Sequence, residues 1–390
     1  MSFSVRRNLT ALYFVKIAKW MNLVMPVIVL FCNSNGLDMQ EIFILQAVYS
    51  VSLMALEIPT GYFADLAGRK TSMLAGSFFG FTGYIIYASG SGFWTFMIAE
   101  VILGIGQSLI SGADSAILYD TLASRKMNHK YPKLEGRITS LGNFAEALAG
   151  ILGGMLALVS LRTPFMVQAV VAFIAVPAAL ALREPPVHTT LRKPGFRDVI
   201  LIVKNTLIDD RKLRWNTLFS AFTGASTLTM AWFAQPFFKS ANMPLSWYGT
   251  VWAILNLAVG VAAIQAWKID RELGTVRTVI LFSVIIVSGF LALALFPSLA
   301  ALAVLLVFYL ARGVATPLLR NYINVITTSD VRATVLSVRN FVIRLSFAAL
   351  GPLFGWITDH YGLREAMMIA GLVFGCLIGI SLYYFIRYKT

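Results

Sequence analysis

The sequence predicts an all-α membrane protein with twelve transmembrane helices in two pseudo-symmetric six-helix bundles. Composition is the first observation. Of the 390 residues, 58% are hydrophobic and 13% are charged, and the mean hydropathy is +0.75. Soluble domains are about half apolar and about a quarter charged. The second observation is a series of apolar segments of bilayer-crossing length, and the third is a set of motifs that occurs in both halves of the chain.

Each predicted helix is a mostly apolar run of about 20 residues, the length needed to cross a hydrocarbon core about 30 Å thick. In chain order the runs are Leu9–Cys32, Glu41–Phe63, Thr71–Ser89, Phe93–Leu122, Ile138–Ser160, Pro164–Leu182, Leu213–Phe238, Trp247–Trp267, Val276–Phe296, Leu299–Thr327, Ala333–Ile357 and Arg364–Arg387. Their even number places both termini on one side of the membrane.

The net charge of +14 lies mostly in the loops between the apolar runs. If the N-terminus is cytoplasmic, the outer loops carry only Arg162, Lys239 and Arg364, and the other loop lysines and arginines face the cytoplasm. This asymmetry follows the positive-inside rule. We therefore predict cytoplasmic termini, a multi-pass protein of a bacterial inner membrane, and a lipid bilayer rather than a nucleic acid as its partner.

The longest polar break divides the chain into two halves. We predict an N-terminal bundle over residues 1–182, a cytoplasmic linker over 183–212 and a C-terminal bundle over 213–390. Within the linker, Phe196, Ile200, Val203 and Leu207 fall on one helical face, which predicts an amphipathic helix on the inner leaflet. A plain solvated linker is the alternative.

A short polar stretch joins the second and third predicted helices: Gly61-Tyr-Phe-Ala-Asp65-Leu-Ala-Gly68-Arg69-Lys70. It resembles the signature loop of the major facilitator superfamily, and a weaker copy begins at Asp270. A second repeat pairs Glu135-Gly-Arg137-Ile-Thr139 with Asp330-Val-Arg332-Ala-Thr334. The resemblance implies two bundles that rock about a site near the membrane midplane, and it points to a branch of that superfamily similar to the drug exporters.

The resemblance also implies a conformational latch. In that family the loop aspartate caps helix eleven and the loop arginine pairs with an acid on helix four. Asp65 is accordingly expected near Ala333 and Thr334, and Arg69 is expected to pair with Asp114 or Asp120. Gly61 and Gly68 are expected to allow the sharp turn between the helices.

Charged residues inside membrane helices are costly and mark candidate functional positions. At a rise of ~1.5 Å per residue, Lys19, Glu146, Arg312 and Arg344 fall near the middle of the membrane. Three of the four are basic, which predicts a cavity for an anionic ligand. Glu146 is the candidate for proton exchange, and the alternative is that it only neutralises Arg344 or Lys19. Lys16 is expected to extend toward the inner interface.

Polar and aromatic residues extend this candidate site. Glu100 and Gln107 share a face of the fourth predicted helix, and Glu100 is a second candidate for proton coupling. Further candidates for ligand contact are Trp232, Gln235, Asn256 and Tyr309.

These features predict a monomeric secondary transporter of a small organic solute, most simply a proton-coupled exporter of an amphipathic or anionic compound. Two departures from the exporter pattern weaken the prediction of export, and the alternative is proton-coupled uptake of an anionic metabolite or chelate. Glu100 stands where exporters of the family commonly carry arginine, and helix five lacks their proline. A non-transporting sensor with the same fold and sodium as the coupling ion are further alternatives. The three histidines lie in loops and no nucleophile or metal-ligand pattern is present, so we expect no enzyme activity, cofactor or metal.

Overall fold

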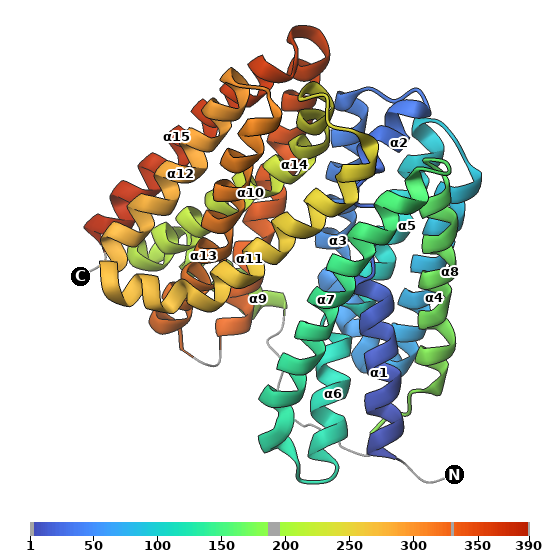
Figure 1. Ribbon diagram of the computed structural model, residues 1–390. Helices are drawn as coiled ribbons and strands as arrows, with labels where there is room; N and C mark the ends of the chain where they lie inside the picture. Colours follow the sequence, from blue (N-terminus) through green and yellow to red (C-terminus); the bar gives the residue numbers. More distant parts are fainter. Residues whose placement is uncertain (1–3, 186–195, 329–330, 389–390) are drawn as a thin grey trace. The chain divides into compact units, whose positions relative to one another are not determined.

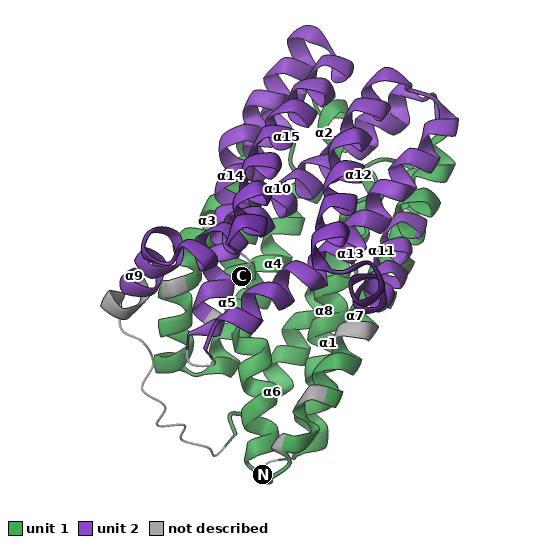
Figure 2. Ribbon diagram, turned by 90° about the vertical axis from the view of Figure 1, so that its left-hand side faces the viewer, with its two compact units in different colours: residues 1–37, 48–190, 244–253 green, residues 38–47, 191–243, 254–390 purple. Residues whose placement is uncertain are grey.

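A computed structural model describes residues 4–185, 196–328 and 331–388. All regular secondary structure in these ranges is helical (Figure 1), which confirms the predicted all-α class. By contacts, the chain divides into two compact units (Figure 2). Unit 1 comprises Met1–Leu37, Val48–Thr190 and Pro244–Ala253, and unit 2 comprises Asp38–Ala47, Leu191–Met243 and Ile254–Thr390.

Unit 1 holds the helices of the first half of the chain. They are α1 (Val5–Trp20), α2 (Ile28–Ser34), most of α3 (Met39–Ala67), α4 (Arg69–Ser89), α5 (Phe93–Ile110), α6 (Ala113–Ala123), η1 (Asn128–Lys130), α7 (Tyr131–Ala157) and α8 (Thr163–Ala181). The most extensive helix contacts in unit 1 are those of α4 with α5, α4 with α8, and α1 with α8.

Unit 2 holds the helices of the second half. They are α9 (Phe196–Lys204), the π-helical turn η2 (Asn205–Asp209), α10 (Arg211–Ser240), most of α11 (Leu245–Leu273), α12 (Thr275–Leu295), η3 (Leu299–Ala301), α13 (Leu302–Ile326), α14 (Arg332–Tyr361) and α15 (Leu363–Arg387). Helix α9 lies in the segment where the sequence predicted an amphipathic helix, and its Ile200 and Leu201 are exposed.

Nine helices among the described residues are long and apolar enough to cross a membrane. The other predicted spans correspond to α1 with α2, to α4 and to α10, so the total of twelve remains a prediction. Exposed apolar side chains follow the outer surface of α8 at Met166, Val170 and Phe173. Such a surface suits hydrocarbon rather than water, because soluble proteins rarely expose long apolar stripes.

The first predicted span, Leu9–Cys32, was wrong as one continuous helix. Helix α1 ends at Trp20 and α2 begins at Ile28. Pro26 disfavours the helical conformation at the residue before it, which explains the break. The Gln168 side chain of α8 accepts a hydrogen bond of 2.8 Å from the backbone N–H of Leu23. The freed backbone is thus satisfied inside the protein, as hydrocarbon surroundings require.

The fourth predicted span, Phe93–Leu122, is also broken. Helix α5 ends at Ile110, and Gly112 has φ +80°, a conformation that glycine adopts without steric cost. Helix α6 then begins at Ala113, with Asp114 in its first turn. The break therefore places a carboxylate at a helix N-terminus.

The start of α3 belongs to unit 2, where α14 caps it. Asp359 accepts hydrogen bonds from the backbone N–H of Met39 (2.9 Å) and Gln40 (2.7 Å). Gly355, one turn earlier on α14, contacts the backbone of Gln40 directly. In a similar way the start of α11 belongs to unit 1, where Gly249 packs against Gly154 of α7.

Replacing Gly355 by leucine should destabilise this contact. A Cβ at Gly355 would lie 2.6 Å from the Cα of Gln40, and backbone cannot yield as a flexible side chain can. We expect a loss of about 1–3 kcal/mol, the usual cost of overpacking, seen as a lower apparent melting temperature in detergent. Gly379→Leu is the control, because no atom lies within 4 Å of a Cβ there. Equal melting temperatures for the two variants would contradict this interpretation.

Candidate functional site

The two helix breaks of unit 1 carry opposite charges that meet. Lys16 and Lys19 lie near the C-terminal end of α1, and Asp114 lies at the N-terminal end of α6. Asp114 is only 4% exposed, and its Oδ2 is 2.6 Å from Nζ of Lys16 and 3.6 Å from Nζ of Lys19. Each charge also complements the partial charge of its own helix end. The expectation that Lys16 extends to the interface was therefore wrong.

Helix α7 adds a second carboxylate to this group. Oε1 of Glu135 is 3.9 Å from Nζ of Lys16 and accepts a hydrogen bond of 3.2 Å from Oγ of Ser115. No described residue hydrogen-bonds Oε2 of Glu135, which is buried. We call Lys16, Lys19, Asp114 and Glu135 the charge cluster. It holds two formal positive and two formal negative charges.

Tyr131 lies on α7 one turn before Glu135, outside the membrane-spanning part of that helix. Burial, and secondly the negative charge of Glu135, raise the pKa of the Tyr131 phenol. The phenol is therefore neutral at physiological pH and adds no charge to the cluster.

The polar stretch at Gly68 forms a second ionic site. The stretch is mostly helical, because α3 continues to Ala67, and the chain turns at Gly68, which has φ +94°. Arg69 contacts the carboxylate of Asp120 and donates to the carbonyl of Ala116 (2.9 Å). Of its two predicted partners, Arg69 therefore pairs with Asp120, while Asp114 belongs to the charge cluster.

The same turn holds the segment that follows α8. Oε1 of Glu184 accepts a hydrogen bond of 2.6 Å from the backbone N–H of Lys70. Gly61 is exposed within α3, with open space where a Cβ would lie, so only Gly68 provides the turn. Asp65 is exposed on α3. Its predicted cap on α14 would join the two units, and the side chain of Ala333 lies outside the described residues, so that cap remains a prediction.

Glu100 lies apart from the charge cluster, in an aromatic core. Its Oε1 accepts a hydrogen bond of 2.6 Å from the Tyr87 hydroxyl, and both residues are buried. The Tyr87 ring stacks on Phe96, with centroids 4.7 Å apart. Gln107 lies two turns further along α5 and is half-buried. The predicted polar face of this helix is therefore divided between two environments.

The remaining predicted site residues divide between the units. Glu146 is half-buried on α7 of unit 1. In unit 2, Arg312 is half-buried on α13, with Cζ 5.6 Å from the centroid of the Tyr309 ring. No carboxylate of the described residues lies within ion-pair distance of Arg312. Trp232, Gln235 and Tyr309 are buried, while Asn256 and Arg344 are half-buried.

Arg339 of α14 is a candidate that the sequence reasoning did not select. It is only 4% exposed, its Nε donates to Oγ of Ser220 on α10, and Nη1 donates to Oδ1 of Asn340 (3.0 Å). Within the described ranges, no carboxylate pairs with it, and Arg320 of α13 adds a second positive charge nearby. The sequence signal was present in the many hydroxyl residues of α10, which make this helix unusually polar for a span.

Comparison with known proteins identifies the class. Residues 10–349 match the family model described as Major Facilitator Superfamily, so the chain belongs to that superfamily of membrane transporters, which is not a class of enzymes. It is 22% identical over 386 residues to the MFS-type transporter YxaM of Bacillus subtilis (strain 168), covering 93% of this chain and 91% of YxaM. It is also 25% identical to the quinolone resistance protein NorA of Staphylococcus aureus, over 43% of this chain and 42% of NorA.

Solved structures show the same fold. The nucleoside transporter NupG aligns with a TM-score of 0.80 at 14% identity, covering 100% of this chain and 100% of NupG. A bacterial homologue of the lysosomal transporter Spinster, in an inward-facing state, aligns with a TM-score of 0.78 at 15% identity, covering 100% of this chain and 98% of that protein. These structural similarities confirm the predicted fold class.

The Arg69–Asp120 pair should show energetic coupling. Arg69→Gln leaves the buried Asp120 carboxylate without its guanidinium partner, whereas Arg69→Gln with Asp120→Asn removes both charges. We expect the double variant to recover ~1–3 kcal/mol relative to the sum of the single changes. Apparent melting temperatures in detergent, with Lys70→Gln as the control, would measure it. Strictly additive effects would show that the contact contributes no coupling energy.

Proposed function

We propose that this protein is a secondary active transporter that moves an acidic small organic solute by alternating access, coupled to protons, with export as the favoured direction. The observation that carries the acidic class is Arg339. Its guanidinium is always protonated, and a buried charge without a counter-charge is strongly unfavourable. A carboxylate or phosphate group of the solute would supply that missing negative charge.

Three arginines of unit 2 lie at two different levels along α13 and α14. Arg320 lies about two turns before the end of α13, and Arg339 lies about two turns after the start of α14, so they share one level. Arg312 lies about two turns deeper on α13. The buried hydroxyls of Thr217 and Thr223 on α10 have no hydrogen-bond partner among the described residues. These groups together support passage of an anion past successive guanidinium groups.

The charge cluster of unit 1 supports proton coupling. Discontinuous helices are where transporters of this kind place their substrate and ion sites. Asp114 lies at such a break and faces Lys16 and Lys19, with Glu135, Ser115 and Tyr131 on the neighbouring segments. Protonation of Asp114 would remove the carboxylate charge that Lys19 faces and would leave Lys16 with Glu135 alone. Glu146 and Glu100 remain the candidates derived from the sequence alone.

The direction of transport is proposed from similarity, and the conformational latch is proposed to control alternating access. NorA is described as a quinolone resistance protein, and this supports export. The latch would comprise Gly68, Arg69 and Asp120, together with Gly61 and Asp65 on α3. Uptake is the second candidate, because Glu100 with its partner Tyr87 occupies the position where exporters of the family commonly carry arginine.

Replacing Arg339 should weaken binding of acidic solutes selectively. A hydrogen bond to a charged group contributes about 1.5–3 kcal/mol, so Arg339→Gln should lower affinity for acidic compounds by about 10- to 100-fold. Ligand-induced thermal shifts of the purified protein, with dicarboxylates, sugar phosphates and neutral analogues, measure this. Arg339→Lys should retain part of the affinity, and Arg364→Gln, an exposed arginine, should retain all of it. If acidic and neutral compounds are affected alike, the acidic class is wrong.

Replacing Asp114 should separate proton coupling from solute movement. Asp114→Asn removes the group proposed to exchange the proton but leaves the solute path intact. In proteoliposomes we expect solute–solute exchange to continue, while accumulation driven by a pH gradient is lost. Glu146→Gln is the parallel variant for the candidate derived from sequence. Unaltered pH-driven accumulation by Asp114→Asn would exclude Asp114 from the coupling role.

A further inference from the structure

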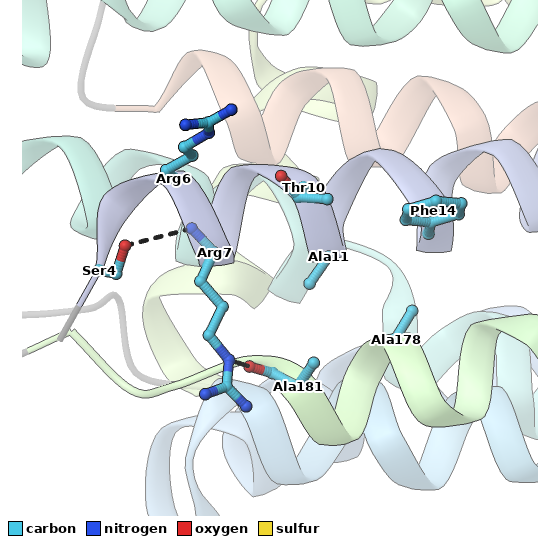
Figure 3. Close-up of a pocket in the computed structure, with 8 residues that line it drawn as sticks. All are labelled: Ser4, Arg6, Arg7, Thr10, Ala11, Phe14, Ala178 and Ala181. Carbon is cyan, nitrogen blue, oxygen red and sulfur yellow. Dashed lines mark hydrogen bonds between the residues drawn. The ribbon is translucent and has the colours of Figure 1, made fainter. Parts of the chain in front are cut away.

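A groove lies on unit 1 between the first turns of α1 and the last turn of α8, away from the charge cluster. Its volume is about 480 Å³. The floor is apolar and is formed by Ala11, Phe14, Ala178 and Ala181, and the polar edge carries Ser4, Arg6 and Arg7 (Figure 3). The groove is therefore amphiphilic, with guanidinium groups at one end and a hydrocarbon surface along its length.

The two helices that form the groove are fixed to each other. Nε of Arg7 donates a hydrogen bond of 2.9 Å to the carbonyl of Ala181, which Figure 3 shows as a link from α1 to α8. Nδ2 of the buried Asn8 donates to the carbonyl of Arg183 (2.8 Å), and its Oδ1 accepts from the Arg183 N–H (3.0 Å). The bond from Arg7 satisfies the carbonyl of Ala181, which lacks a partner at the end of α8, and Asn8 fixes the backbone of Arg183 just beyond it. The groove is thus a built feature of unit 1.

The charged end of the groove suits a phosphate group. Arg6 and Arg7 are exposed and extend from α1 in different directions (Figure 3). The Arg7 guanidinium is held in place through its Nε, which leaves its two terminal nitrogens as donors. Guanidinium groups bind phosphate oxygens through paired hydrogen bonds. The positive end of the α1 dipole, beside the N-cap residue Ser4, favours an anion at the same place.

The apolar part of the groove suits an acyl chain. Phe14 is half exposed beside the small side chains of Ala11 and Ala178, so the floor is flat and open along α1. Further along α8, Phe173 and Val170 are also exposed. In a chain that spans the membrane, such a surface faces lipid, and a diacyl lipid offers both a phosphate and a hydrocarbon chain.

We propose that this groove is a binding site for an anionic phospholipid of the leaflet that faces the N-terminus. The phosphate binds the terminal nitrogens of Arg7, Arg6 adds positive charge at the same edge, and one acyl chain lies along Ala11, Phe14 and Ala178. Because anionic lipids attract basic segments beside membrane helices, the charge of this edge selects phosphatidylglycerol over phosphatidylcholine. The bound lipid would hold α1 against α8 at the membrane boundary. The site does not depend on which solute the protein carries.

Lipid binding to the purified full-length protein tests the proposal. Native mass spectrometry of detergent-solubilised protein, titrated with phosphatidylglycerol or phosphatidylcholine, measures the affinity for each lipid. The double variant R6Q/R7Q should bind phosphatidylglycerol roughly thirtyfold more weakly, from ~1 kcal/mol for each basic residue, and should lose less affinity for phosphatidylcholine, whose choline cation offsets the charge of its phosphate. The matched control K133Q/R137Q removes two exposed basic residues of α7 outside the groove and should bind as the wild type does.

Two further variants distinguish lipid binding in the groove from non-specific attraction of the lipid to a positively charged surface. Ala178→Trp fills the floor without changing charge and should also weaken phosphatidylglycerol binding. Arg6→Gln alone leaves the hydrogen bond from Arg7 to the Ala181 carbonyl intact. If R6Q/R7Q does not fold, weaker phosphatidylglycerol binding by this single variant tests the proposal. The proposal is overturned if the control weakens binding as much as R6Q/R7Q, if Ala178→Trp has no effect, or if inorganic phosphate displaces the lipid. A dimer that Ala178→Trp dissociates, without loss of lipid binding, would instead assign the groove to a second copy of the chain.

Discussion

A backbone amide or carbonyl inside a bilayer finds no water, so the protein itself must satisfy every group that leaves a helix. This constraint explains where the chain can break. At the break after α1, the Gln168 side chain accepts a hydrogen bond from the N–H of Leu23. At the start of α3, the Asp359 carboxylate accepts hydrogen bonds from the successive N–H groups of Met39 and Gln40. Irregular backbone therefore occurs where another helix brings a polar side chain to meet it.

Charges in the membrane obey the same constraint, and the two units meet it differently. Unit 1 balances its half-buried Lys16 and Lys19 with Asp114 and Glu135. In the described part of unit 2, Arg339 has only a hydroxyl and an amide as partners, although it is more deeply buried than the lysines. A balanced group can change its charge by gaining a proton, whereas an arginine that lacks a counter-charge favours an incoming anion. In the proposed function, this contrast assigns proton coupling to unit 1 and solute recognition to unit 2.

The all-helical class and the superfamily were predictable from sequence because both depend on local features. Apolar runs of bilayer length identify spans without knowledge of their packing. The turn at Gly68 followed by Arg69 is a short motif whose geometry is set by a glycine with positive φ. The choice between Asp114 and Asp120 as the partner of Arg69 was not predictable, since both acids lie on α6 and only packing against α4 distinguishes them.

The charge cluster was missed because depth was counted along continuous helices. With Leu9–Cys32 treated as one helix, Lys16 and Lys19 appeared to be separate from Asp114. Pro26 and Gly112 indicate the two helix breaks in the sequence. A hydropathy pattern does not reveal such breaks, because both residues lie within apolar runs. Arg339 was undervalued for a related reason. Its importance comes from the absence of an acid around it in the folded, described part of unit 2, and only three-dimensional contacts reveal that.

The way the chain leaves unit 1 has a mechanical consequence. Just after α8, Arg183 is held by Asn8 of α1, and the next residue, Glu184, is held by the backbone N–H of Lys70. Lys70 adjoins Arg69, whose guanidinium contacts Asp120. A pull on the connecting segment beyond Glu184 would therefore act first on the turn at Gly68 and on the ionic contact beside it. The segment that follows Glu184 is therefore fixed beside the Arg69–Asp120 contact. Movement of this segment would be transmitted to that contact.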